Sequence, residues 1–182
     1  MVYTPPPELA GLSLTQIAQA VAERRLPPVE QWEPDAVDDS HMRILADGTW
    51  LHEGSPITRP AMVRAFSGLL RREADGTYYL VMPYQKLRIE VEDACFIATD
   101  VSRVDGDLAF RLNTDELVVA GPDHPIRAAG DADMPSIYLG VRRGCAARLN
   151  RSTYEQLAQI ALAEGDDWHV TSGGETYSLL PA

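Results

Sequence analysis

Residues 47–60, with the sequence DGTWLHEGSPITRP, hold several side chains that can take part in catalysis. His52 and Glu53 begin like the HExxH motif of zinc proteases, but that motif needs a second histidine at the position of Pro56. Ser55 lies in EGSPI, which lacks the second glycine of the GxSxG motif of serine hydrolases. The stretch therefore predicts neither of these two catalytic sites.

Motifs for metals and cofactors are also missing from the sequence. The four histidines are scattered, and Cys95 and Cys145 are far apart, so no cluster has the spacing of a metal site. Neither GxGxxG nor a P-loop occurs, which removes the common phosphate-binding loops. We therefore expect no metal, no cofactor and two free thiols.

The charge of the chain limits its partners. Its 182 residues include 16 basic and 27 acidic side chains, a formal net charge of -11, which repels the phosphates of a polynucleotide. Lys86 is the only lysine, and arginine binds phosphate and carboxylate through a planar fork of donors. This bias favours a small anionic ligand, but a high genomic GC content or ion pairing with the surplus carboxylates explains it equally well.

The sequence predicts a cytoplasmic protein that does not contact a membrane. Its first residues lack the basic and apolar regions of a signal peptide. No stretch reaches the roughly 18 apolar residues of a membrane span.

The spacing of apolar residues predicts helices and strands along the chain. Ser13 and Gln16 form a capping box for a helix that ends before Pro27. Asp-Gly pairs at 47–48 and 105–106 predict two β-hairpins.

Two more helices are expected, each between predicted strands. Thr58 is the expected N-cap of a helix over 59–73, and Ser152 caps a helix over 153–164. Residues 121–135 are rich in glycine, proline and aspartate and are expected to form a loop.

The order of elements around these two helices suggests an internal duplication. One copy runs TWLHEGSPI, helix, GTYYLVMP, and the other runs YLGVRRGCAARL, helix, ETYSLLP. We expect an α+β protein with two small subdomains, each packing one helix on a mostly antiparallel sheet. The expected divisions are an N-terminal extension with a helix (1–28), an N-terminal subdomain (29–92) and a C-terminal subdomain (93–182).

The duplication also predicts where arginines meet. Arg59 is expected at the N-terminus of the helix over 59–73, a position that favours anions. Arg142 and Arg148 lead into the helix over 153–164. If the two helix starts are equivalent, these arginines face a common cleft.

Several stretches together resemble a bacterial family, the domain of unknown function 1285. They are DGTWLHEGSPITRPAMVRAFSGLLRREADGTYYLVMP, KLRIEVEDACF, DHPIRA, IYLGVRRGCAARLNRSTYEQL and GGETYSLL, and the resemblance covers residues 32–180. The chain departs from the family pattern Thr-Pro-x-Glu-Lys at 82–86, which read MPYQK, and it has Cys95 where the family has a proline.

The resemblance implies a two-part α+β fold with a repeated motif and a C-terminal half similar to pleckstrin-homology (PH) folds. It implies a nucleotide-like ligand between the halves and a role in signal transduction, without an established activity. The family's motifs place the candidate ligand-binding residues at Trp50, His52, Ser55, Arg59, Arg142 and Arg148.

Our leading hypothesis is a cytoplasmic sensor, not an enzyme, that binds a small anionic ligand between its subdomains. Trp50, Tyr78 and Tyr84 are candidates for stacking on a base. The alternatives are a protein-interaction module that offers an exposed sheet edge to a partner and a hydrolase with an unrecognised site around His52.

Overall fold

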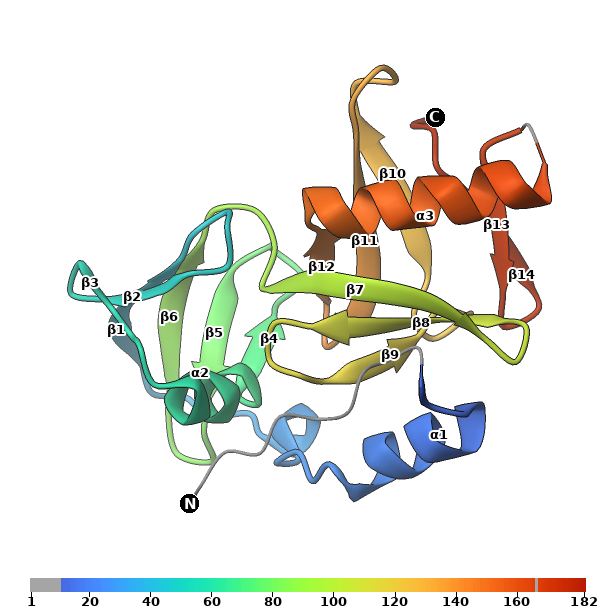
Figure 1. The fold of residues 1–182 in the computed structure, drawn as a ribbon. Helices are drawn as coiled ribbons and strands as arrows, with labels where there is room; N and C mark the ends of the chain where they lie inside the picture. Colours follow the sequence, from blue (N-terminus) through green and yellow to red (C-terminus); the bar gives the residue numbers. More distant parts are fainter. Residues whose placement is uncertain (1–10, 166) are drawn as a thin grey trace.

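The protein consists of two halves, each built around a six-stranded sheet (Figure 1). The computed structural model describes residues 11–165 and 167–182, so part of the predicted N-terminal extension, residues 1–10, lies outside the described residues. Helix α1 (Leu14–Glu23) and the 3-10 turn η2 (Val29–Gln31) precede the first sheet. The predicted capping box is confirmed, because the Ser13 hydroxyl accepts from the Gln16 backbone and the Gln16 side chain accepts from the Ser13 backbone.

The N-terminal sheet has the strand order β3-β2-β1-β6-β5-β4. Its strands are β1 (Val37–Ile44), β2 (Trp50–His52), β3 (Ser55–Pro56), β4 (Leu70–Arg72), β5 (Tyr78–Val81) and β6 (Lys86–Val91). The central strands β1 and β6 pair in parallel, and all other neighbours are antiparallel. Helix α2 (Pro60–Ser67) connects β3 to β4.

The C-terminal sheet has the strand order β10-β11-β12-β7-β8-β9. Its strands are β7 (Phe96–Val104), β8 (Asp107–Leu112), β9 (Leu117–Val119), β10 (Ile126–Gly130), β11 (Pro135–Arg142) and β12 (Cys145–Leu149). Helix α3 (Arg151–Glu164) follows β12 and packs against β7, and the hairpin of β13 (His169–Ser172) and β14 (Glu175–Ser178) closes the chain (Figure 1).

The two sheets share one connectivity. In each half the order is third, second, first, sixth, fifth and fourth strand, and the first and sixth strands form the parallel pair. The predicted fold class, two α+β halves with mostly antiparallel sheets, is confirmed. The repeat itself therefore shows in the strand order, although residue identity between the halves is low.

The predicted matching of the two copies is wrong. It aligned the two helices, but α2 lies between the third and fourth strands of its half and α3 follows the sixth strand. The segments that correspond are the hairpins whose turns are at 47–48 and 105–106, each between the first and second strands. The starts of α2 and α3 are therefore not equivalent positions.

The predicted helix over 59–73 is too long. α2 ends at Ser67, and Leu70 pairs with Leu80 in the sheet, which places Arg71 and Arg72 in strand β4. Its N-cap is Arg59 and not Thr58.

Two other local predictions differ from the structure. Residues 126–130 of the predicted loop form strand β10, because their backbone pairs with β11. Helix α3 is capped by Asn150, whose side chain accepts a hydrogen bond from the Thr153 backbone at 2.9 Å, so Ser152 lies inside the helix.

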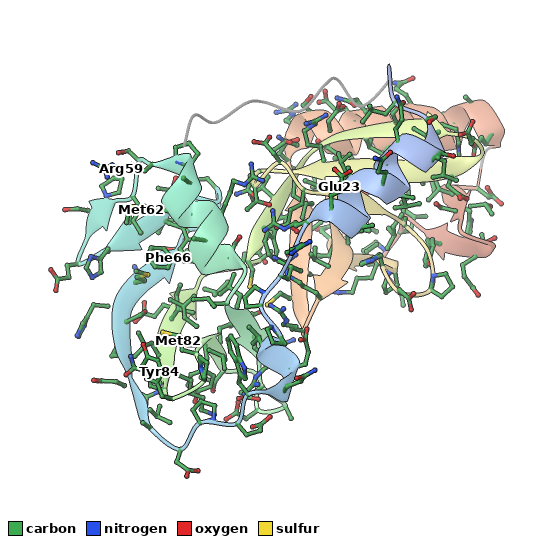
Figure 2. The ribbon with its side chains drawn as sticks, turned by 90° about the horizontal axis from the view of Figure 1, so that it is seen from below. Glu23, Arg59, Met62, Phe66, Met82 and Tyr84 are labelled. Atoms are coloured by element: carbon green, nitrogen blue, oxygen red, sulfur yellow. The ribbon has the colours of Figure 1, made fainter. Side chains whose placement is uncertain are left out.

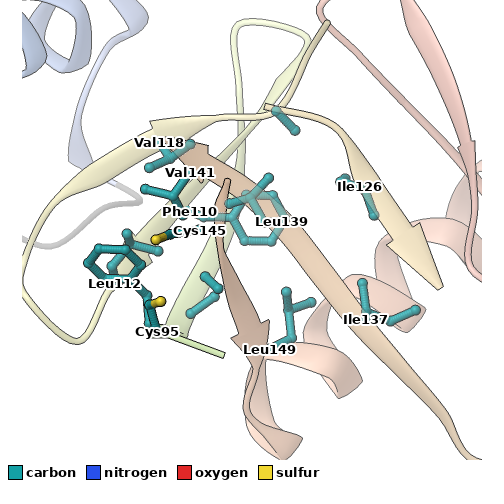
Figure 3. Close-up of a cluster of buried hydrophobic side chains, with 14 of the residues drawn as sticks. Cys95, Phe110, Leu112, Val118, Ile126, Ile137, Leu139, Val141, Cys145 and Leu149 are labelled. Carbon is teal, nitrogen blue, oxygen red and sulfur yellow. The ribbon is translucent and has the colours of Figure 1, made fainter. Parts of the chain in front are cut away.

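One apolar core extends through both halves. Buried side chains of the first sheet, such as Trp50 and Leu80, belong to the same cluster as Phe96, Phe110 and Leu139 of the second, part of which is shown in Figure 3. Burial of this kind supplies most of the favourable free energy of folding. In the part of the chain that the structure describes, no helix is both long enough and apolar enough to cross a membrane.

Candidate functional site

The turn between β11 and β12 joins the two halves. The Arg143 side chain, only 3% exposed, donates to the carbonyl oxygens of Gly68 at 2.7 Å and Pro27 at 2.8 Å and pairs with Glu30. The Arg143 carbonyl oxygen accepts from the backbone N–H of Arg72 at 2.9 Å. These bonds fix the edge strand β4 against the second sheet.

Gly144 lets the backbones of the two halves approach closely. Its φ is +76°, and a Cβ atom there would lie 3.1 Å from Cβ and 3.2 Å from the carbonyl oxygen of Arg72. Another residue at this position would be strained and would push β4 away.

A cleft of about 430 Å³ opens beside this turn, with walls from both halves. Arg72 and Tyr78 line it from strands β4 and β5, and Asp93 and Ala94 line it from the segment before β7. The remaining lining residues come from 123–146: Asp123, Arg127, Ala129, Tyr138, Gly140, Val141, Arg142, Arg143, Gly144, Cys145 and Ala146.

Two exposed arginines face this cleft without a carboxylate partner among the described residues. The guanidinium of Arg72 lies over the Tyr78 ring, 5.6 Å from its centroid. The guanidinium of Arg127 lies over the Tyr138 ring, 4.3 Å from its centroid. Each ring orients its guanidinium through a cation–π contact, and the donors at the edge stay available to an anion.

The other arginines near the cleft each bind an acidic side chain. Arg142 binds Glu116, and its Nη2 donates to the other carboxylate oxygen at 3.1 Å. Arg148 Nη1 donates to Asp93 Oδ2 at 2.8 Å. Among the described residues, Arg72 and Arg127 are therefore the arginines of this lining that have no carboxylate partner, and Asp123 is an opposing exposed charge.

The tyrosines of the cleft remain protonated and can donate hydrogen bonds. Burial raises the pKa of Tyr78 and of Tyr138, and the hydrogen bond to Asp93 adds to the effect on Tyr138. The Tyr138 hydroxyl donates to Asp93 Oδ1 at 2.7 Å. This bond also places the Tyr138 ring under Arg127.

Four of the predicted site residues lie in the N-terminal half, outside this cleft. Trp50 is 2% exposed and stacks on Phe66 in the core, so its ring is not open to a ligand. His52 and Ser55 are exposed on β2 and β3. Arg59 caps α2 at the outer end of that helix, away from the C-terminal half (Figure 2).

Two of the predicted site residues lie at the cleft. Arg142 is part of its lining, and Arg148 forms an ion pair with Asp93, which also lines it. Arg72 and Arg127 were missed by the sequence reasoning. The sequence predicts that Arg72 lies at the end of a helix and that Arg127 lies in a loop. DHPIRA, among the resembling motifs, was the signal that pointed toward Arg127.

Two other cavities are lined by arginines that bind carboxylates. The larger, about 730 Å³, is mostly apolar and lies along α1 and β9, and its Arg24 and Arg142 both bind Glu116. The other, about 630 Å³, lies at the start of α3, where Arg148 and Arg151 each pair with a carboxylate.

Neither metal chemistry nor a catalytic histidine is suggested by the arrangement of side chains. Within residues 11–165 and 167–182, no three His, Cys, Asp or Glu side chains are grouped so that they could hold a metal ion. His52 is exposed, and it makes no hydrogen bond or ion pair with a carboxylate of this part of the chain.

Comparison with known proteins gives family matches over both halves. A model described as "Domain of unknown function (DUF1285), N-terminal domain" matches residues 27–94, and "Protein of unknown function (DUF1285), C-terminal domain" matches residues 95–179. A DUF1285 family crystal structure from Silicibacter pomeroyi DSS-3 is 37% identical over 93% of this chain and 96% of that chain, with a TM-score of 0.79.

A second DUF1285 family crystal structure, from Shewanella baltica OS155, is 25% identical over 65% of this chain and 90% of that chain, with a TM-score of 0.53. A comparison with curated proteins finds no match.

Proposed function

The chain belongs to the DUF1285 family, and from its cleft we propose that it is a sensor that binds a small, phosphate-bearing, nucleotide-like ligand between its two halves. A cytoplasmic location and a role in signal transduction are part of the same proposal. The site is the cleft lined by Arg72, Tyr78, Arg127 and Tyr138.

The observation that carries the proposal is the pair of arginines in one cleft that have no carboxylate partner among the described residues. In a chain with a net charge of -11, a carboxylate is available to most arginines, and Arg142, Arg143 and Arg148 each have one. Arg72 and Arg127 face one cleft from opposite halves, and each is held over a tyrosine instead. Guanidinium groups of this kind bind phosphate and pyrophosphate oxygens through pairs of charge-assisted hydrogen bonds.

A planar base is the second expected part of the ligand. Tyr78 and Tyr138 supply aromatic surface and protonated hydroxyl groups beside the arginines. A guanidinium stacked on a ring also presents a flat face on which a base can stack. Because the lining comes from both halves, a bound ligand would change how firmly the halves hold together.

Among the described residues, the surroundings of His52 favour binding over the alternative of a hydrolase at this histidine. A hydrolase around His52 needs a carboxylate that orients the imidazole. The described part of the chain offers none within hydrogen-bonding distance of His52.

A thermal-shift screen tests the proposal. The probes are adenosine and guanosine monophosphates, cyclic dinucleotides and inorganic pyrophosphate, each added to the wild type, Arg72→Gln, Arg127→Gln and Arg59→Gln. A probe at 100 times its Kd stabilises the folded protein by about 2.7 kcal/mol. Losing one charge-assisted hydrogen bond costs about 1.5–3 kcal/mol, so Arg72→Gln and Arg127→Gln should weaken binding about 10- to 100-fold.

Arg59→Gln is the matched control, because it removes an exposed arginine outside the cleft. We expect it to bind as tightly as the wild type. If Arg59→Gln loses the shift and the two cleft variants keep it, the ligand binds at the start of α2 and the cleft proposal is wrong.

A partly exposed apolar stripe favours the alternative, a protein-interaction module. Met62, Phe66, Met82 and Tyr84 follow one another along one side of the N-terminal half (Figure 2). Met62 is 40% exposed and Tyr84 is 71% exposed. If the folded protein responds to no anionic probe, the interaction module becomes the favoured function. Met62→Gln and Tyr84→Ser should then weaken the binding of a partner protein to this stripe.

A further inference from the structure

Two thiols lie together at the junction of the halves. Cys95 directly precedes β7 and Cys145 begins β12, and these strands are parallel neighbours in which Phe96 pairs with Ala147. Cys95 is 1% exposed and Cys145 is 3% exposed, and Figure 3 shows both sulfur atoms in the same buried cluster. They are free, as the sequence predicted.

The two cysteines are not equivalent. Cys145 belongs to the lining of the cleft, and Cys95 does not. The hydrogen bond between the thiols lowers the pKa of Cys145, and nearby Arg142 and Arg143 lower it further, against the effect of burial. The same hydrogen bond, followed by burial, raises the pKa of Cys95 well above its ordinary value. Cys145, which lines the cleft, is therefore the more readily deprotonated of the two thiols.

We propose that Cys145 is a peroxide-reactive thiol and that Cys95 resolves its oxidised form as an intramolecular disulfide. A buried sulfur beside a cleft admits only a small oxidant, so the substrate class is hydrogen peroxide or a small organic hydroperoxide. The inference does not depend on which anion the cleft binds.

The chemistry proceeds in two steps. The Cys145 thiolate attacks one oxygen of the O–O bond, that bond breaks, and the leaving alkoxide or hydroxide takes up a proton as Cys145 becomes a sulfenic acid. The Cys95 thiol then attacks the Cys145 sulfur, an S–S bond forms, and water leaves. In sum, two thiols lose two electrons, and the hydroperoxide is reduced to an alcohol, or to water for hydrogen peroxide, plus one water.

The disulfide would form next to the contact that defines the cleft. Cys145 follows Gly144, whose backbone packs on Arg72. Oxidation therefore acts on the same turn that positions Arg72, and it links the redox state of the protein to the shape of the cleft.

Mass spectrometry after hydrogen peroxide treatment tests this chemistry on the full chain. In the native wild type we expect the loss of two thiols and a disulfide between the peptides that hold Cys95 and Cys145, reversed by dithiothreitol. In Cys95→Ser we expect the reaction to stop at a Cys145 sulfenic acid that dimedone traps. In Cys145→Ser, Cys95 should stay reduced at the same dose.

The disulfide mapping on the wild type needs no variant, so a misfolded substitution does not decide the result. A wild type that keeps both thiols at doses that oxidise the urea-unfolded chain overturns the proposal. Trapping of Cys95 instead of Cys145 overturns the assignment of roles.

Discussion

At the scale of single residues, the partners of an arginine separate structural from binding roles. The buried Arg71 donates to the carbonyl oxygens of Val29 and Trp32 and to Glu73, so it belongs to the framework. Arg72, the next residue, lines the cleft, and its guanidinium lies over the Tyr78 ring without a carboxylate partner among the described residues. The sequence shows fifteen arginines but not these partners, because the partners come from distant segments. This is why the predicted site contained Arg142 and Arg148 and missed Arg72 and Arg127.

The Arg71–Glu73 pair predicts how stability depends on pH. The hydrogen bond from Arg71, with help from Lys86, lowers the pKa of Glu73 below its ordinary value of 4.5. The folded protein therefore gains stability from the charged carboxylate above that value, and the gain is lost as the pH falls through the lower pKa of the folded state. We expect the free energy of unfolding of Glu73→Gln to fall less steeply than that of the wild type below about pH 5.

Urea unfolding at a series of pH values between neutral and acidic checks this prediction. Glu90→Gln is the control, since the Glu90 side chain is far more exposed, at 72%, in its pair with Arg43. Parallel pH curves for the wild type and Glu73→Gln would show that the Glu73 pair does not contribute to acid sensitivity.

At the scale of elements, the sequence predicts most helices and strands correctly but places several of their boundaries wrongly. The Asp-Gly hairpins and the capping box at Ser13 are set by local turn and capping chemistry, which the sequence shows directly. Leu69 and Leu70 fit the apolar spacing of a helix, but pairing with β5 makes Leu70 part of a strand. Strand β10 also depends on a neighbour, β11, so its five residues looked like a loop.

The β11–β12 turn gives a prediction at this scale. Gly144→Ala introduces a Cβ at a positive φ and against Arg72, whereas Gly54→Ala has a similar φ of +82° with nothing within 4 Å. The unfavourable backbone conformation alone costs about 1–2 kcal/mol, so Gly54→Ala should lose about that much stability. Gly144→Ala should lose more and should also weaken binding of any probe that the wild type binds.

Equilibrium unfolding in urea gives the two stability changes, and the thermal-shift screen gives binding. The difference between the two variants isolates the contact with Arg72. Equal losses of stability, with binding unaffected in both, would mean that β4 does not need the close approach at Gly144.

At the scale of the whole molecule, a shared core and one turn unite two sheets of identical connectivity. Arg143 is the central connection, because its buried side chain holds Gly68 and Pro27 of the N-terminal half. The sequence predicts a repeat, but the strand order shows which segments of the two halves correspond. The two helices do not mark equivalent positions, because a helix can be inserted at any connection of a repeated sheet.

Removing the Arg143 side chain tests how tightly the halves unfold together. Arg143→Gln leaves two carbonyl oxygens without their donor, which we expect to cost about 3 kcal/mol. Tryptophan fluorescence, measured in a Trp168→Phe background so that it reports on Trp32 and Trp50 of the N-terminal half, and far-UV circular dichroism should then give separate urea transitions.

Arg151→Gln is the control, because Arg151 is exposed and, within residues 11–165 and 167–182, forms its ion pair with Glu155 one helical turn away. It should keep the wild-type transition. Coincident transitions at the wild-type midpoint in Arg143→Gln would show that the shared core alone couples the halves.

The parallel pair at the centre of each sheet has a consequence for the order of folding. The first strand of each half pairs with the sixth, so its long edge stays open until the whole half has been synthesised. Closing so long a loop is entropically costly, and contacts that are distant in sequence slow folding. On the ribosome, the hairpin of β1 and β2 can form at once, but the sheet closes only when β6 emerges. Each half is therefore most prone to wrong pairing and aggregation just before its last strand arrives.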